Sequence, residues 1–214
     1  MKKYKLTFLL DKSNNWILPY LQKFIKNHKK KKYKFNISHN YKLIKNEDIV
    51  LALGYTRILP VSFLKKNKLN LTIHESALPK NRGFSPIQYQ ILNNKNLINV
   101  SLIELSSAVD SGELLMSLKF KFIGNELYDE IRKIQSEKTF LLIKKFLKIY
   151  PNFKKRRQNG KPNYLKKRSP KDSELNINKT LKENFNLMRI NNNDRWPSFF
   201  KFKKTKYILK IFKG

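Results

Sequence analysis

His74 and Asp110 are the residues of this sequence whose types and surroundings suit acid–base chemistry. The stretch from Leu69 to Ile73 alternates and is rich in β-branched residues, which predicts a buried strand that ends at His74. Asp110 follows a second apolar stretch and precedes a serine and a glycine. An imidazole can exchange a proton with a reacting group, and a carboxylate can orient the imidazole. Together they could donate a hydrogen to a reacting oxygen and relay protons through water.

The elements around His74 must hold it at an accessible edge. A loop interrupted by proline and glycine follows the strand, so the chain turns there. We expect a helix to begin at Ser85, which would cap it, with Pro86 in the first position and Gln88 completing a capping box. Strand, loop and helix in this order present a reactive side chain at the carboxyl edge of an open α/β sheet.

The separation of the two residues fits this arrangement. His74 and Asp110 are 110 − 74 = 36 positions apart, which accommodates a loop, a helix and a return strand. We expect two parallel strands to place both side chains at one edge of the sheet. Taken singly, a histidine after a strand is usually a structural residue, and an aspartate near glycine usually forms a turn.

Two motifs resemble the signatures of folate-dependent formyltransferases. The first runs His74-x-Ser76-x-Leu78-Pro79-x-x-Arg82-Gly83-x-x-Pro86, and the second is a strand followed by Asp110-Ser-Gly112. That family includes glycinamide ribonucleotide, methionyl-tRNA and nucleotide-sugar N-formyltransferases. The resemblance covers residues 48–123 well, with a looser likeness over residues 168–200.

The resemblance implies a fold, a cosubstrate and a site. The fold is an α/β, open, mostly parallel, Rossmann-like sheet with a short C-terminal helix and a β-hairpin. The cosubstrate is 10-formyltetrahydrofolate. The catalytic residues implied are His74, Asp110 and Thr72. Ser76, Leu78, Pro79, Arg82, Gly83 and Gly112 are the implied cofactor-binding residues, and Tyr55, Arg57 and Arg189 are the implied substrate-binding residues, although Arg57 is equally suited to be a surface cation.

Position 72 departs from the family pattern, which has asparagine two residues before the histidine. Formyl transfer creates an oxyanion that needs a hydrogen-bond donor, and a proton must also leave the attacking amine. Thr72 faces the same side as His74, because residues two apart in a strand point the same way. Its hydroxyl is a single donor on a shorter arm than an amide. Loss of such a donor typically costs ~3 kcal/mol of transition-state stabilisation, so an inactive relative that keeps the fold is an alternative.

The net charge and the cysteine and histidine content limit which partners and metal sites this protein can have. The net charge of +32 is compatible with a nucleic-acid partner or with composition bias, and we favour bias because the lysines are spread along the chain. The same positive charge would also attract a small substrate that carries phosphate. The absence of cysteine excludes disulfides and thiolate metal sites, and three scattered histidines show no metal-ligand spacing.

We expect residues 1–150 to form the α/β core, and residues 151–214 to form a basic loop and an extension packed on it, as one compact domain. The basic loop contains Lys154–Arg157 and Lys166–Arg168. It either binds a diphosphate or is a solvated connection, and we favour the connection. The apolar run Leu6–Leu10 is too short for a membrane span, so a cytoplasmic protein without one is expected. The apolar hairpin near the C-terminus is a plausible homodimer contact.

Three functions remain. The first is an N-formyltransferase acting on a small amine acceptor, which we expect to be a nucleotide-linked amino sugar for surface polysaccharide, with another small phosphorylated amine as the alternative acceptor. It is favoured by the two motifs, by the charge, and by the lack of room for the tRNA-binding domain of a methionyl-tRNA formyltransferase. The second is a formyltransferase-like binding protein that lost its chemistry at Thr72. The third, a nucleic-acid-binding protein, has only the charge to support it.

Overall fold

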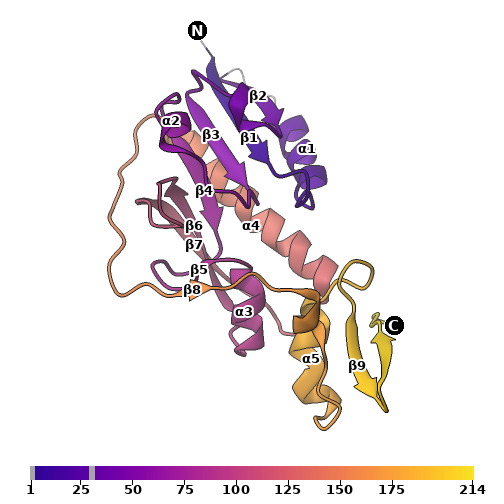
Figure 1. The fold of residues 1–214 in the computed structure, drawn as a ribbon. Helices are drawn as coiled ribbons and strands as arrows, with labels where there is room; N and C mark the ends of the chain where they lie inside the picture. Colours follow the sequence, from indigo (N-terminus) through magenta and orange to yellow (C-terminus); the bar gives the residue numbers. More distant parts are fainter. Residues whose placement is uncertain (1–2, 29–31) are drawn as a thin grey trace.

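The fold is built on a six-stranded sheet, and the computed structural model describes residues 3–28 and 32–214 (Figure 1). The strand order is β2-β1-β3-β4-β6-β7. Their bounds are β1 Tyr4–Leu10, β2 Tyr33–Ser38, β3 Ile49–Leu53, β4 Asn70–His74, β6 Leu97–Glu104 and β7 Leu114–Lys121. Strands β2, β1, β3 and β4 are mutually parallel, which confirms the mostly parallel α/β sheet.

The strand that follows the first motif runs in the opposite direction to the one expected. β6 pairs antiparallel with β4, so that His74 lies opposite Ser101 and Leu71 lies opposite Glu104. The intervening helix α3 (Pro86–Leu92) lies at the carboxyl end of β4 and does not cross back over the sheet (Figure 1). The chain therefore re-enters the sheet from the end at which it left, and the predicted parallel return strand is wrong.

Helix α3 begins where expected, but not by the expected cap. Ser85 has a left-handed backbone, with φ of 53°, and its side chain makes no capping hydrogen bond. Pro86 still occupies the first turn, where its missing N–H costs nothing. The predicted capping box is therefore absent from this helix.

Helices cover both faces of the sheet. All five residues of β3 are buried, as expected for a strand that is covered on both sides. The main core lies between the sheet and helices α1 (Leu18–Asn27) and α4 (Tyr128–Ile149). A smaller core forms around Val50 and Phe63, the latter from helix α2 (Val61–Leu64), close to the 3₁₀ turn η1 (Tyr41–Leu43).

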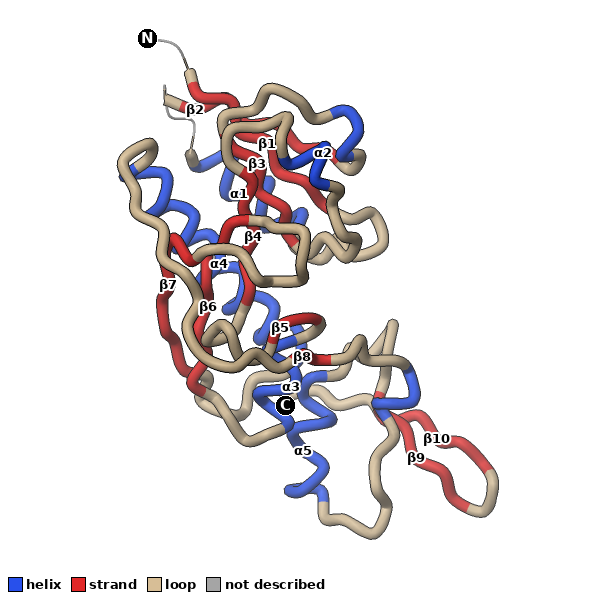
Figure 2. The backbone as a smooth tube through the Cα atoms, turned by 60° about the vertical axis from the view of Figure 1, so that its left-hand side comes forward, coloured by secondary structure: helices blue, strands red, loops and turns tan. Residues whose placement is uncertain are grey.

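The expected C-terminal helix and hairpin are present. Helix α5 (Leu181–Ile190) packs against α3 and α4, and its Ile190 joins the main core. Strands β9 (Ser198–Phe202) and β10 (Thr205–Leu209) form an antiparallel hairpin that lies away from the sheet (Figure 2). No helix in the described ranges is both long and apolar enough to cross a membrane.

A long connection, residues 150–169, joins α4 to the 3₁₀ turn η2 (Pro170–Ser173), and we call it the strap (Figures 1 and 2). Its basic side chains are mostly exposed, but its backbone is paired with the core. Arg156 bridges Leu114 at the start of β7. The two-residue strand β8 (Tyr164–Leu165) pairs with β5 (Arg82–Gly83), inside the first motif.

Candidate active site

A cleft of about 440 Å³ opens at the carboxyl ends of β1, β3 and β4. It is lined by the loop after β1, residues 52–59 after β3, the end of β4, the start of α3, residues 103–110, and one face of α4. This is the edge at which open α/β sheets usually bind ligands.

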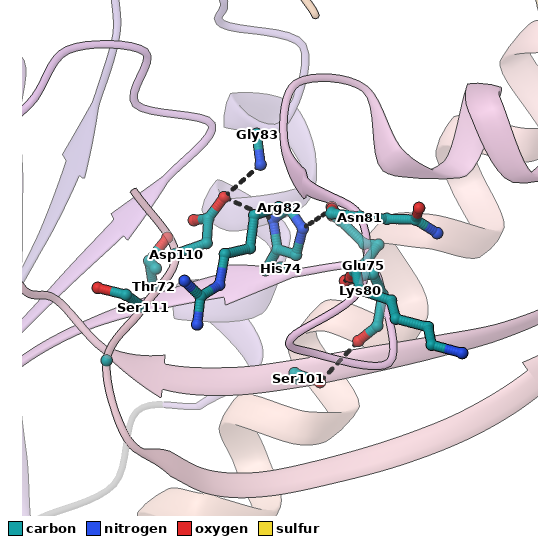
Figure 3. Close-up of polar contacts among 12 residues, drawn as sticks. Thr72, His74, Glu75, Lys80, Asn81, Arg82, Gly83, Ser101, Asp110 and Ser111 are labelled. Carbon is teal, nitrogen blue, oxygen red and sulfur yellow. Dashed lines mark hydrogen bonds and ion pairs between the residues drawn. The ribbon is translucent and has the colours of Figure 1, made fainter. Parts of the chain in front are cut away.

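His74 and Asp110 meet in the wall of this cleft (Figure 3). The imidazole is 5% exposed, and its Nδ1 lies 3.4 Å from Asp110 Oδ2. Nε2 lies 2.6 Å from the backbone carbonyl oxygen of Asn81. Because a carbonyl oxygen can only accept, Nε2 carries the hydrogen of this bond. The two nitrogens are thus oriented by one loop oxygen and one carboxylate.

A folded-back loop delivers Asp110 to the histidine. β6 ends near the start of β4, so the chain must return along the sheet before it reaches Asp110. Asp110 itself has a left-handed backbone with φ of 47°, a conformation that aspartate tolerates better than most residues. Its Oδ2 accepts a 2.8 Å hydrogen bond from the backbone N–H of Gly83 (Figure 3). The pair is therefore held by two loops and not by two parallel strands.

The two motif glycines allow backbones to approach closely. Gly83 has φ of 98°, and a Cβ at this position would lie 2.5 Å from the carbonyl oxygen of Leu165 in the strap. A Cβ on Gly112 would lie 1.8 Å from the carbonyl oxygen of Glu104. Gly83 also lines the cleft, whereas Gly112 lies behind it.

Thr72 lines the cleft next to His74, as expected from the strand alternation. Its hydroxyl donates a 2.8 Å hydrogen bond to the backbone carbonyl of Ala52 in the neighbouring strand. Since a hydroxyl has one hydrogen, the group presents only lone pairs to the cleft. The expectation that Thr72 offers a short donor there does not hold in this structure.

Four residues assigned to cofactor binding stabilise the loop of the first motif and lie outside the cleft lining. Ser76 is fully buried and donates to the carbonyl of Lys80. Arg82 is 9% exposed and donates to the Tyr164 hydroxyl and to Gln158 Oε1, both in the strap. Leu78 and Pro79, which the structure joins by a cis peptide bond, form part of the same loop.

The substrate-binding residues divide into two groups. Tyr55 and Arg57 line the cleft, with the guanidinium 5.2 Å from the Tyr55 ring centroid. The Tyr55 hydroxyl is buried without a hydrogen-bond partner among the described residues, and burial raises its pKa.

Arg189 lies elsewhere, 1% exposed and away from the cleft lining. It donates to Asn186 and Asn96 and faces Glu126 at 3.4 Å. Burial lowers the pKa of Arg189, and Glu126 opposes this effect. The structure therefore encloses the Arg189 side chain in protein and does not bring it to this cleft, where its predicted contact with substrate would have to be made.

The lining of the cleft also includes Trp16, Arg132 and Gln135, which were not among the predicted site residues. Arg132 from α4 stacks on Trp16, with 4.4 Å between the guanidinium carbon and the ring centroid. It donates to Gln135, which in turn donates to Glu75. Arg132 and Gln135 lie outside both motifs, so no sequence signal marked them.

Asp11 joins two of the cleft loops. Its carboxylate accepts hydrogen bonds from the hydroxyl of Thr56 and from the N–H and hydroxyl of Ser13. The Thr56 hydrogen bond is the main reason that the pKa of Asp11 falls to about 2, and the Ser13 bonds add to this effect while burial opposes it. Asp11 lies outside both motifs, so no sequence signal marked it as part of the site.

The sequence matches the family described as formyl transferase over residues 8–143. Methionyl-tRNA formyltransferase of Orientia tsutsugamushi is 30% identical over 134 residues, which is 60% of this chain and 43% of that protein. This chain therefore spans less than half of that relative's length.

Solved structures resemble the whole chain. The methionyl-tRNA formyltransferase of Clostridium thermocellum has a TM-score of 0.82 at 20% identity, covering 97% of this chain and 92% of that one. A likely sugar N-formyltransferase from Mycobacterium tuberculosis has a TM-score of 0.76 at 14% identity, covering 97% of each chain. HypX from Aquifex aeolicus, in complex with tetrahydrofolic acid, has a TM-score of 0.78 at 15% identity, covering 96% of this chain and 37% of that one.

Proposed function

We infer that this chain, which belongs to the formyl transferase family, transfers a formyl group from 10-formyltetrahydrofolate to the amine of an acceptor. The observation that supports this most strongly is the His74–Asp110 pair, 3.4 Å apart in the wall of the main cleft. Two loops and a strand end meet to form it, and its groups are those that amine acylation requires.

The residues would act in sequence on the acceptor and the formyl oxygen. A bond forms between the amine nitrogen and the formyl carbon, and the bond from that carbon to the folate nitrogen breaks. His74 Nδ1, the ring nitrogen that is not bonded to Asn81, faces Asp110 Oδ2 and, when it carries a hydrogen, donates it to the charge that develops on the formyl oxygen. Asp110 holds the imidazole and, through water, takes the proton lost by the amine and returns it to the departing nitrogen.

The cleft suits a folate cosubstrate. 10-Formyltetrahydrofolate supplies the formyl carbon and a nitrogen leaving group. Residues 52–59 and 103–110 both line the cleft, and their apolar side chains, such as Leu59, Ile103 and Leu105, favour a flat ring. The buried, unpartnered hydroxyl of Tyr55 would gain a hydrogen-bond partner from a polar edge of such a ring.

For the acceptor we propose a nucleotide-linked amino sugar. Arg57 and Arg132 both line the cleft, and neither forms an ion pair with a carboxylate among the described residues. Such guanidinium groups suit the phosphates of a nucleotide. A second acceptor, methionyl-tRNA, is favoured by the sequence relatives, which include methionyl-tRNA formyltransferases.

A second function is a folate-binding protein with impaired catalysis. The observation that favours it is the hydrogen bond from Thr72 to Ala52, which leaves position 72 without a donor for the oxyanion. The fold and the folate pocket would be kept, while turnover would be slow or absent.

Binding and turnover separate these functions. Folinic acid, a formyl analogue that does not transfer its group, should raise the melting temperature in either case, since a ligand of the native state stabilises it. Formyl transfer from 10-formyltetrahydrofolate is then measured with nucleotide-linked amino sugars and with methionyl-tRNA. Folinate binding without transfer to any acceptor would favour the impaired binder, and no folinate binding would contradict both functions.

A further inference from the structure

We propose that Gln158 and Asn163 of the strap are positioning residues that hold the His74–Asp110 pair in its working geometry. This inference rests on the proposed function of that pair. The strap is remote in sequence from both motifs, yet it contacts the loop of each motif behind the cleft wall.

Gln158 holds the loop that carries the carboxylate. Its Nε2 donates two 2.8 Å hydrogen bonds, to the backbone carbonyls of Asp110 and Gly112. Its Oε1 accepts a 2.7 Å hydrogen bond from Arg82 in the other motif. One amide therefore ties the second motif to the first. The left-handed backbone of Asp110 makes this tie important, because even for aspartate that conformation is less favourable than the extended or right-handed helical ones.

Asn163 holds the residue that orients the imidazole. Its Oδ1 accepts a 2.9 Å hydrogen bond from the backbone N–H of Asn81, and its Nδ2 donates to Asn81 Oδ1 at 3.2 Å. The carbonyl of Asn81 is the partner of His74 Nε2 (Figure 3). A shift of Asn81 would move the oxygen that sets the ring's orientation.

The strap is itself fixed on both sides of these residues. Arg156 and Leu114 exchange two backbone hydrogen bonds of 2.8 and 2.9 Å. Further along, the carbonyls of Asn163 and Leu165 accept hydrogen bonds from the N–H groups of Arg82 and Phe84. The close approach of Leu165 requires the glycine at position 83. The strap is therefore fixed firmly enough to hold the loops of Asp110 and Asn81 in place.

The hydrogen bonds of Gln158 and of Asn163 can each be removed by a substitution that changes the size of the side chain little. Gln158→Glu keeps the oxygen that faces Arg82 but replaces the donor with an oxygen that faces two carbonyls. Asn163→Ala removes both contacts with Asn81. Asn163→Asp keeps an acceptor for the backbone N–H of Asn81, so it should retain the activity that Asn163→Ala loses. Asn159→Ala is the matched control, since this exposed strap residue makes no side-chain hydrogen bond among the described residues.

The kinetic test separates turnover from binding. We expect Gln158→Glu, Gln158→Ala and Asn163→Ala to lower kcat by about 10- to 100-fold, because small displacements of catalytic groups have costs of this order. The KM for 10-formyltetrahydrofolate should change much less. Asn163→Asp and Asn159→Ala should retain kcat within about threefold of wild type. If Gln158→Ala fails to fold, Gln158→Glu, with its contact to Arg82 kept, serves as the test.

A second readout does not depend on activity. The ring signals of His74 are followed by heteronuclear NMR without substrate and assigned with His74→Gln. We expect the variants with lowered kcat to shift the ring signals of His74, while those of His28 and His39 stay in place. Unchanged His74 signals with unchanged kcat, or a loss of kcat that Asn159→Ala shares, would overturn the positioning role. Absence of formyl transfer by the wild type would overturn the proposed function alone, and the NMR signals would still test the positioning.

Discussion

Asp110 Oδ2 lies 3.4 Å from His74 Nδ1, although the strands that precede the two residues are antiparallel. The carboxylate reaches the imidazole because residues 105–113 fold back and because the Gly83 N–H binds the same oxygen. The site thus depends on loop geometry that has to be held from behind. Each prediction below concerns one part of that support or one part of the chemistry.

The hydroxyl of Thr72 should contribute little to kcat in the wild-type protein. Its hydroxyl hydrogen is donated to Ala52, so Thr72→Val should keep kcat within about threefold of wild type and cost about 1 kcal/mol of stability. Thr72→Asn, which introduces an amide donor, should raise kcat by about tenfold or more, within the ~3 kcal/mol that one oxyanion donor supplies. Steady-state formyl transfer by the three proteins checks this. A large loss of kcat in Thr72→Val would show that the hydroxyl serves the reaction.

Gly112 should be required for folding of the second motif. A Cβ there would overlap the carbonyl of Glu104, so the backbone must move to accept alanine. We expect Gly112→Ala to lower the free energy of unfolding by about 1–3 kcal/mol, the usual cost of overpacking. Urea unfolding measures this, with Glu113→Ala as the control. Equal stability of Gly112→Ala and wild type would mean that the loop follows another path.

Arg189 should matter for stability and not for the substrate. It is enclosed with Glu126, and removing one partner of a buried ion pair typically costs ~3–5 kcal/mol. We expect Arg189→Ala to be strongly destabilised, whereas Arg195→Ala, at an exposed position on the same segment, should be nearly neutral. At a temperature where both are folded, their dissociation constants for folinic acid should match that of wild type. Weaker binding by Arg189→Ala alone would restore the substrate role inferred from sequence.

Asp11 should make stability depend on acid pH. Its pKa is lowered to about 2 in the folded protein, so the stabilisation is complete above the ordinary value of 3.8 and is lost as the pH falls towards 2. Each pKa unit corresponds to about 1.4 kcal/mol, so the charge contributes ~2 kcal/mol near neutral pH. Urea unfolding of wild type and Asp11→Asn should therefore show a gap that narrows between about pH 4 and pH 2. A gap that stays constant over this range would contradict the assigned pKa.

Local patterns predicted the elements well, and long-range contacts were missed. The strand that ends at His74 and the start of helix α3 at Pro86 lie where expected, since alternation and the proline at the helix start are local signals. The direction of β6 was wrong, because 36 residues of separation fit either a crossover or a return from the same end. The site pair was identified from motif and spacing, whereas Gln158 and Asn163 were missed. A polar residue in a basic loop carries no sign of the distant backbone that it will contact.

The most direct test of the central claim is single-turnover formyl transfer by His74→Ala and Asp110→Asn. Both should lose about 10²-fold or more in rate, the order expected when an oxyanion donor or a proton-relaying group is removed. Asp194→Asn, at an exposed aspartate, should match wild type. Folinate affinity within about threefold of wild type would show that the cleft is intact. Retention of near-wild-type rates by both His74→Ala and Asp110→Asn would contradict the assignment of this pair as the catalytic centre.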